Sequence, residues 1–208
     1  KAVRFPVNAV RVFRSRTSDG VRGMKLASGD KVISMTILHG IKASMEEREA
    51  YLTIPVEKRL EISKGNEEFT PEALGVSLSK EQIADLAKGE EFILTISENG
   101  LGKRSSAYHY RITNRGGSGI VNMVLSEKTG EVVASMPANT NDEIMLITNN
   151  GKLIRCRLDA VRITGRSTSG VILFKTEKDE KVVSASLIAD SSEEEEVLDE
   201  DGGDNTVM

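Results

Sequence analysis

The chain has 208 residues, 38% of them hydrophobic but only 4% aromatic, and a formal net charge of −4, which suits one ordinary domain or two small ones. A single cysteine, Cys156, excludes an internal disulfide framework, and the two histidines form no Cys/His cluster with metal-ligand spacing. No apolar run is long enough to span a membrane and the first residues lack the apolar core of a signal peptide, so we expect a cytoplasmic protein with no membrane partner.

Residues 1–40 read as a run of short β-strands separated by turns. The segment opens on KAVRF and closes on GDKVIS, a turn followed by a short strand. Lys1 is not a natural start and Val3 to Phe5 already reads as the middle of a strand. We therefore expect this chain to be part of a longer protein whose preceding strand is missing here.

Residues 41–91 differ in composition and carry helix signals. Ser79 and Gln82 form a capping box that predicts a helix from about Lys80 to Lys88, and a second helix is expected near residues 46–50. The segment LTIPVEKRLEI is interpreted as extended. We expect an acidic, partly helical insertion in the first repeat, either a solvated decoration or a lobe that binds a partner.

Residues 92–140 and 141–189 open alike, with FILTISENGLGKR and IMLITNNGKLIR. Each is an apolar run, an Asn-Gly pair and a second run that carries Arg. Asn-Gly between β-rich runs predicts a tight hairpin, because both residues tolerate positive φ. With residues 1–40, these segments form three copies of one repeat, each of about four short strands, which is the length of a propeller-type blade.

Arginines recur at matched positions in the three repeats. The first-column arginines are Arg4, Arg104 and Arg155. The second-column arginines are Arg11, Arg111 and Arg162, and the third-column arginines are Arg16, Arg115 and Arg166. A glycine column follows at Gly20, Gly119 and Gly170. An ordinary all-β protein has no reason to repeat arginine in register, so the columns indicate a function.

The net charge hides a strong segregation of charge. Residues 41–91 hold 7 basic and 12 acidic residues, and residues 190–208 hold 9 acidic and no basic ones. The rest of the chain carries 28 − 7 = 21 basic and 32 − 12 − 9 = 11 acidic residues, or about +10. This pattern indicates a body that binds a polyanion, followed by a disordered acidic tail that either solubilises the chain or competes for the basic surface.

No catalytic constellation is visible. The GGSG run at residues 116–119 lacks the Lys-Ser/Thr of a phosphate loop, and the other repeats have turns at this place. Double-stranded DNA is the expected partner, because Arg binds phosphate bidentately and nothing in the repeats resembles a base-reading helix. Some of these side chains are expected to tie neighbouring blades instead. The candidate contacts are Arg4, Arg11, Arg14, Arg16, Arg22, Lys103, Arg104, Arg111, Arg115, Arg155, Arg157, Arg162 and Arg166.

The runs GKRSSAYHYRITNRGGSGI and VRITGRSTSGVILFKT resemble the C-terminal DNA-wrapping domain of the bacterial DNA gyrase A protein. The resemblance implies an all-β fold, a β-pinwheel of which this chain holds about three of six blades. It also implies sequence-nonspecific DNA wrapping at the nucleoid in support of ATP-dependent negative supercoiling, in a heterotetramer formed by the whole gyrase A protein with the gyrase B protein. ATP and Mg would be bound by other domains, so no cofactor is expected here.

The family's Gln-Arg-Arg-Gly-Gly-Lys-Gly box is absent from this chain, as is the core that holds the catalytic tyrosine. Tyr51, Tyr108 and Tyr110 therefore do not inherit that role, and the resemblance implies no catalytic residue in this chain. Two alternatives stay open. One is the C-terminal domain of the corresponding topoisomerase IV protein, and the other is a propeller-like scaffold that binds proteins.

Overall fold

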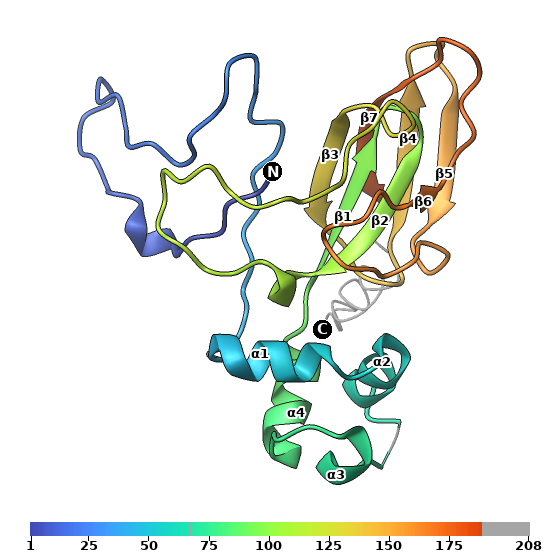
Figure 1. Ribbon diagram of the computed structural model, residues 1–208. Coiled ribbons are helices and arrows are strands. Elements are labelled where there is room, and N and C mark those ends of the chain that lie inside the picture. The colour runs from blue at the N-terminus through green and yellow to red at the C-terminus, as the bar shows by residue number, and fades with distance from the viewer. Residues whose placement is uncertain (67, 189–208) are drawn as a thin grey trace, which may run out of the picture.

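The computed structural model describes residues 1–66 and 68–188, in which two β-sheets stand above a group of helices (Figure 1). Every regular strand of the described residues lies in the second and third repeats. The acidic tail expected at residues 190–208 lies outside the described residues.

The first sheet is built mainly by the second repeat. Strand β1 (Phe92–Ser97) pairs antiparallel with both β2 (Leu101–Ser106) and β3 (Val132–Pro137). The predicted Asn-Gly turn joins β1 to β2, with Gly100 at φ +74°. The fourth strand, β6 (Val171–Ile172), comes from the third repeat and pairs with β2, so this blade is completed by its neighbour.

The second sheet is built by the third repeat. Strand β4 (Glu143–Thr148) lies between β5 (Leu153–Arg157) and β7 (Val182–Ile188), all antiparallel. Alternate residues of β4 are buried, as expected for a strand with one face on a core. The second predicted hairpin is therefore confirmed.

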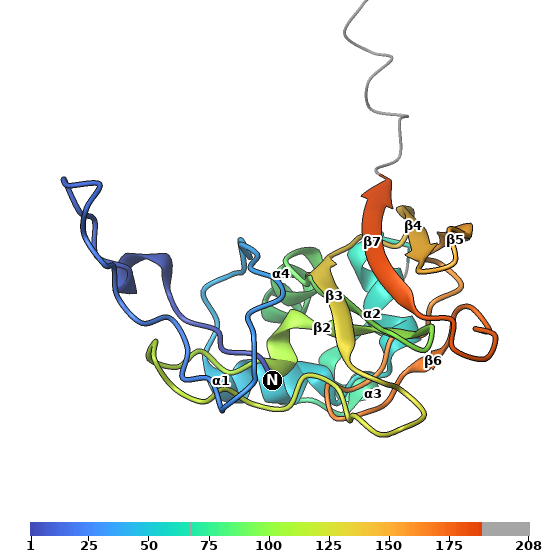
Figure 2. The same ribbon diagram turned by 90° about the horizontal axis from the view of Figure 1, so that it is seen from above.

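One apolar core joins the two sheets. Leu94 and Ile96 of β1 pack in the same cluster as Ile144 and Leu146 of β4, and all four are fully buried. Strands β3 and β7 lie side by side at this junction (Figure 2). Because the core is shared, the relative position of the two blades is fixed by packing.

The first repeat departs from the expectation of short strands. Among residues 1–40 the structure has a 3₁₀ turn, η1 (Val7–Ala9), and two isolated bridges, Ala2 to Ile120 and Arg4 to Ile112. In the other repeats the central strand pairs on both sides, and residues 1–40 contain no strand in that central position. Without such a partner, apolar residues such as Val12 and Met35 stay exposed.

Residues 41–91 form a unit of four helices, here called the helical lobe. The helices are α1 (Met45–Leu52), α2 (Val56–Ser63), α3 (Pro71–Leu74) and α4 (Lys80–Lys88). The predicted helices at 46–50 and 80–88 are confirmed, the latter with its capping box. The extended interpretation of LTIPVEKRLEI is wrong. The segment forms helix α2 after Pro55, which occupies the N-cap position, and the helix buries Arg59 and Ile62, three residues apart on one face.

The helical lobe is docked firmly on the second repeat. Tyr108, in the turn η2 (Ala107–His109), is buried in the lobe's core and donates a hydrogen bond of 3.0 Å to the Leu86 carbonyl. Its ring meets that of Tyr51 edge to face, 5.8 Å between centroids. Arg59 and Glu90 form an ion pair whose side chains are 6% and 3% exposed. The lobe is therefore a packed part of the domain and not a loose loop.

The described residues lack two kinds of feature. None of their helices is both long enough and apolar enough to cross a membrane. Within residues 1–66 and 68–188, no three His, Cys, Asp or Glu side chains lie together as a metal site would need. Cys156 is half-buried, and burial raises the pKa of its thiol.

Candidate nucleic-acid interface

Two of the first-column arginines, Arg4 and Arg104, each hold one repeat to the next. Arg104 is 3% exposed, and its guanidinium donates to the Val161 carbonyl and to the Thr140 hydroxyl, both at 3.0 Å. Arg4 makes the corresponding contact at the preceding junction, donating to the carbonyls of Ala107 at 2.8 Å and Tyr110 at 3.4 Å. Tyr110 and Val161 each precede a second-column arginine. Burial lowers the pKa of both arginines, yet both stay charged because their ordinary pKa is so high.

Two of the third-column arginines, Arg115 and Arg166, each hold one repeat to the one before it. Arg166 donates to the Val121 carbonyl at 2.8 Å, and Arg115 donates to the Arg22 carbonyl at 3.2 Å. Arg22 and Val121 each lie two residues after a glycine of the glycine column. The same joint is thus built twice, once at each junction between repeats.

The glycine column lets these joints close. Gly119 and Gly170 have φ of +74° and +80°, in the left-handed region that favours glycine. A Cβ at Gly119 would lie 2.6 Å from the Ala2 carbonyl oxygen, and one at Gly170 would lie 2.6 Å from that of Gly102. Each glycine therefore allows a strand of one repeat to approach the backbone of the preceding repeat.

Lys103 is also an internal tie. The side chain is fully buried and its ammonium donates to the carbonyls of Gly165, at 3.0 Å, and Arg166. Burial, with a smaller contribution from the charge of Arg166, lowers the pKa of Lys103 to about 8. The sequence predicts DNA contact by Lys103 and Arg104, and the structure places both side chains inside the junction between repeats, away from the exposed surface.

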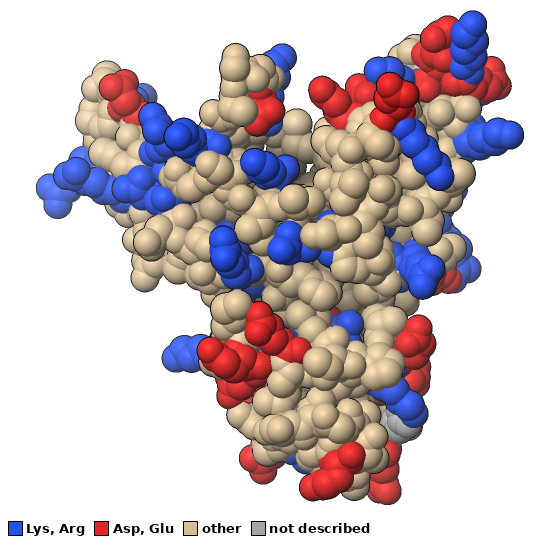
Figure 3. Space-filling view, in the orientation of Figure 1, with Lys and Arg blue, Asp and Glu red and all other residues tan. Residues whose placement is uncertain are grey.

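The second-column arginines are exposed and carry unused charge. Within residues 1–66 and 68–188, no carboxylate pairs with Arg11, Arg111 or Arg162, and no hydrogen bond engages their guanidinium groups. Arg11 lies over the ring of Phe13 at 5.3 Å. Three further arginines of the first repeat are exposed and unpaired in the same described part: Arg14, Arg16 and Arg22. Figure 3 shows basic side chains gathered over this segment, at the left, and acidic ones on the helical lobe below.

The remaining two candidates lie at the edge of the second sheet and have acidic neighbours. Arg155 is 64% exposed and pairs with Glu143, and Arg157 is 73% exposed and pairs with Asp159 at 2.6 Å. Exposed ion pairs of this kind contribute little, about 0–1 kcal/mol. Both arginines could therefore exchange these carboxylates for phosphates at small cost.

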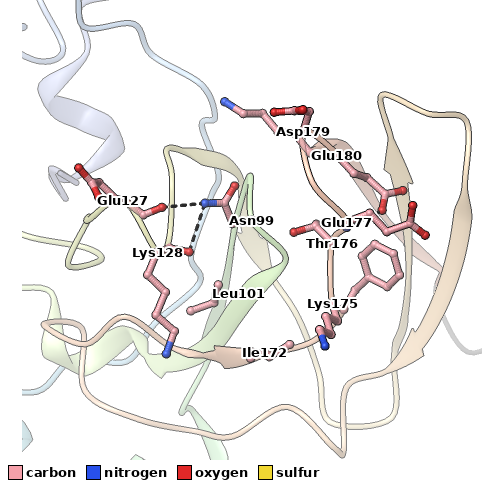
Figure 4. A pocket seen from close by; sticks show the side chains of 12 residues that line it. Asn99, Leu101, Glu127, Lys128, Ile172, Lys175, Thr176, Glu177, Asp179 and Glu180 are labelled. Atoms are coloured by element: carbon pink, nitrogen blue, oxygen red, sulfur yellow. Dashed lines mark hydrogen bonds between the residues drawn. The ribbon is translucent and has the colours of Figure 1, made fainter.

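The end of the sheets where the hairpin turns lie carries charges of both signs. A hollow of about 450 Å³ lies there, lined by side chains of both signs, among them Glu127, Lys128, Lys175 and Glu177 (Figure 4). Asn99 closes one side by donating to the carbonyls of Glu127 and Lys128 at 2.9 and 3.2 Å. Mixed charge gives no preference for a polyanion, so this end is the weaker candidate for a DNA surface.

The three arginine columns are alike in the sequence but not in the structure. Arg4, Arg104, Arg115 and Arg166 hold neighbouring repeats together, whereas the second-column arginines are exposed. The hydrogen bonds between repeats join residues far apart in the sequence, 57 residues from Arg104 to Val161 and 93 from Arg115 to Arg22. One signal in the sequence could have helped: Arg104 lies within a predicted strand, whereas Arg111 and Arg162 follow in the irregular segments. A strand position between two blades is more often buried than a loop position.

Comparison with known proteins supports the fold and the repeat. The family model described as "DNA gyrase C-terminal domain, beta-propeller" matches residues 1–39, 91–139 and 142–189. The chain therefore belongs to the DNA gyrase C-terminal domain family, and the predicted all-β, pinwheel class is confirmed. The match passes over residues 40–90, which hold the four helices.

Curated relatives agree with this assignment. The chain is 65% identical over its whole length to the DNA gyrase A protein of Rickettsia prowazekii, strain Madrid E, covering 23% of that protein. It is 43% identical over 98% of its length to the DNA gyrase A protein of Granulibacter bethesdensis, again covering 23%. The chain thus spans less than a quarter of these relatives.

Two solved structures are similar to parts of the chain. A DNA gyrase A C-terminal domain matches 49% of this chain and 35% of its own, at 27% identity and a TM-score of 0.46. The C-terminal domain of a DNA topoisomerase IV matches 47% of this chain and 31% of its own, at 19% identity and a TM-score of 0.44.

Proposed function

We propose that the chain binds and bends double-stranded DNA as part of the wrapping domain of a gyrase A protein. The observation that carries this proposal is the set of exposed arginines without acidic partners among the described residues, one at the same position in each repeat: Arg11, Arg111 and Arg162. Phosphates lie at regular intervals along DNA, and basic side chains at regular intervals can replace their counterions one by one. Arg14, Arg16 and Arg22 extend the surface along the first repeat.

The other candidates have different roles in this proposal. Arg4, Arg104, Arg115, Arg166 and Lys103 hold neighbouring repeats together, so they position the DNA-binding arginines without touching DNA. Arg155 and Arg157 join the DNA surface once they leave their surface carboxylates. The binding surface is thus a smaller set than the sequence indicates.

Binding depends on the DNA backbone and on its ability to bend, not on base sequence. Base reading in the major groove usually needs a helix or ribbon that presents Asn, Gln or Arg. The four described helices lie in the helical lobe, whose 12 acidic residues against 7 basic ones would repel DNA. We infer that the DNA path runs along the arginines of the repeats and avoids the lobe.

We also infer that this part of the protein supplies binding and not bond cleavage. The three tyrosines of the chain are all buried phenols whose hydroxyls donate to Glu90, to the Leu86 carbonyl and to Asn122. Burial raises the pKa of Tyr110 to about 12 and raises those of Tyr51 and Tyr108 further. None of the three is poised as a nucleophile.

The wider role follows from the family. We propose that the domain supports ATP-dependent negative supercoiling at the nucleoid, in a heterotetramer of the whole gyrase A protein with the gyrase B protein. The family model that matches is that of gyrase, which favours gyrase over the topoisomerase IV alternative. The exposed arginines at repeated positions disfavour a protein-binding scaffold, which has no need for them.

Fluorescence anisotropy with a labelled duplex, measured across a salt series, tests the function. Six phosphate contacts predict that affinity falls about 10³-fold between 50 and 200 mM salt. A second duplex of the same length and scrambled sequence is the control and is expected to bind equally well. Binding that ignores salt, or that follows base sequence, would show that the arginines do not act as proposed.

We propose in addition that residues 190–208, with nine acidic and no basic residues, compete with DNA for these arginines. Deleting them is expected to raise DNA affinity at low salt and to change little at high salt, where exposed charges are screened. The same anisotropy assay checks this, and unchanged affinity at low salt would contradict it.

A further inference from the structure

A basic hollow lies at the junction of the first and second repeats. Its volume is about 420 Å³, within the range of small-ligand sites. Three arginines line it, Arg4, Arg111 and Arg115, and no Asp or Glu is among its lining residues. Arg4 and Arg115 are held by backbone carbonyls, whereas the guanidinium of Arg111 has no partner among the described residues. The hollow therefore combines positive charge with an unused donor.

A glycine-rich turn forms the other wall of the hollow. The turn is residues 116–119, the GGSG run of the second repeat. In the described structure, the amide N–H groups of Gly117, Ser118 and Gly119 donate to no protein acceptor. Successive backbone N–H groups in a turn that contains left-handed residues are a known setting for anions, and Gly116 and Gly119 have φ of +81° and +74°.

The equivalent place at the next junction is filled by the protein itself. Lys103 lies there, with its ammonium on the carbonyls of Gly165 and Arg166. One position before a first-column arginine, the second repeat has Lys103 and the first repeat has Val3. Val3 is too short and too apolar to reach the turn as Lys103 does, and it lines the hollow instead. The two junctions share their ties and differ in this one side chain.

We propose that this hollow is a seat for one phosphate group of the DNA backbone. The inference rests on the proposed function, since DNA is the source of the phosphate. Arg111 and the amides of the glycine-rich turn would donate to the phosphate oxygens, with Arg4 and Arg115 adding positive charge. Three guanidinium groups without a carboxylate repel a cation, so the hollow selects an anion. The plugged junction at Lys103 has no such seat, and its exposed Arg162 contacts DNA only from the surface.

Titration with inorganic phosphate, followed by ¹H–¹⁵N NMR of the whole chain, tests the seat without DNA. Saturable shifts are expected for the amides of residues 117–119, while those of the equivalent residues 168–170 stay in place. Val3→Met is expected to abolish the shifts by filling the hollow with an uncharged side chain. Arg111→Ala is a second variant whose exposed side chain leaves the fold intact, and it is expected to weaken phosphate binding. Its matched control, Arg162→Ala, is expected to leave phosphate binding unchanged.

DNA binding by the same variants separates the seat from the general charge of the surface. Val3→Met adds and removes no charge and keeps Arg111, yet it is expected to lower DNA affinity, because the phosphate can no longer reach the amide donors of the glycine-rich turn. Arg111→Ala is expected to lower the slope of log affinity against log salt by about 0.9, the value for one phosphate contact. Lys103→Met removes a positive charge, yet it is expected to leave the slope unchanged. Circular dichroism of each variant confirms that it is folded.

The outcomes distinguish the two proposals. Salt-dependent DNA binding by the wild-type chain without shifts at residues 117–119, or with the same DNA affinity in Val3→Met, overturns the seat and leaves the proposed function standing. Absence of DNA binding by the wild-type chain overturns the proposed function, and with it the assignment of the phosphate to DNA. Matching losses in Val3→Met by both assays support the seat.

Discussion

Arg104 and Arg162 belong to the same repeated motif, but we predict that mutating Arg104 lowers stability and that mutating Arg162 weakens DNA binding. Arg104 is buried and bonded across the junction, whereas Arg162 is exposed and unpaired within the described residues. Arg104→Met keeps much of the volume and removes the donors. Arg162→Ala removes an exposed charge. The first change should affect stability, and the second should affect DNA binding.

The magnitude for Arg104 follows from its two hydrogen bonds, each 3.0 Å long. A hydrogen bond to a charged group contributes about 1.5–3 kcal/mol. Part of that sum is offset, because the variant no longer buries a guanidinium, a cost that also lowers the pKa of Arg104. We expect a net loss of about 2–4 kcal/mol, or roughly 5–15 °C in Tm at 2–4 °C per kcal/mol for a chain of this size.

Thermal unfolding followed by circular dichroism measures the first effect, and anisotropy across a salt series measures the second. Arg162→Ala is expected to change stability by less than about 0.5 kcal/mol. Its slope of log affinity against log salt should fall by about 0.9, while Arg104→Met should keep the wild-type slope below its Tm. If Arg104→Met were as stable as the wild type and had a reduced slope, the claim that Arg104 holds repeats together without contacting DNA would be refuted.

Three further predictions concern buried groups. Glu90→Ala leaves Arg59 buried without its carboxylate and should cost about 3–5 kcal/mol by urea unfolding, and a near-neutral result would mean that the pair is not buried in solution. Gly170→Ala meets the Gly102 carbonyl oxygen at 2.6 Å and should lower Tm more than Gly20→Ala, which has a similar φ of +79° but open space around it; equal losses would contradict the close approach. Between about pH 8, the pKa of Lys103 in the folded chain, and about pH 10.4, its unfolded value, the unfolded chain binds more protons, so this group should make stability rise with pH. Urea unfolding at pH 7.5–10 checks this against Lys103→Met, which should lack that increment; parallel pH profiles would contradict it.

Local signals in the sequence determined the secondary structure where partners are close along the chain. The Asn-Gly pairs fixed two hairpins whose strands lie within 16 residues, and the capping box of Ser79 and Gln82 fixed helix α4. These elements depend on bonds between near neighbours. The segment that forms α2 has only a weak local preference, so the sequence prediction that it is extended was wrong. Its helical conformation is decided by burial of Arg59 and Ile62 in the lobe.

The repeat and its basic charge could also be recognised in the sequence, because identical positions must be filled by compatible residues in every blade. The match of the family model to three separate segments agrees with that interpretation. The docking of the helical lobe could not be recognised in this way. Tyr108 lies in the second repeat yet fills the core of residues 41–91, a contact that composition and periodicity do not indicate.

What only the tertiary structure decided is which of the basic residues face solvent. In the sequence, Arg104 and Arg162 both belong to the repeated arginine columns, and Val3 and Lys103 each come directly before a first-column arginine. In space, Arg104 and Lys103 are bonded to carbonyls some 60 residues away, Arg162 is left to the solvent, and Val3 leaves a hollow. The physical reason is that exposure depends on contacts between repeats, and those form only when the blades pack against each other.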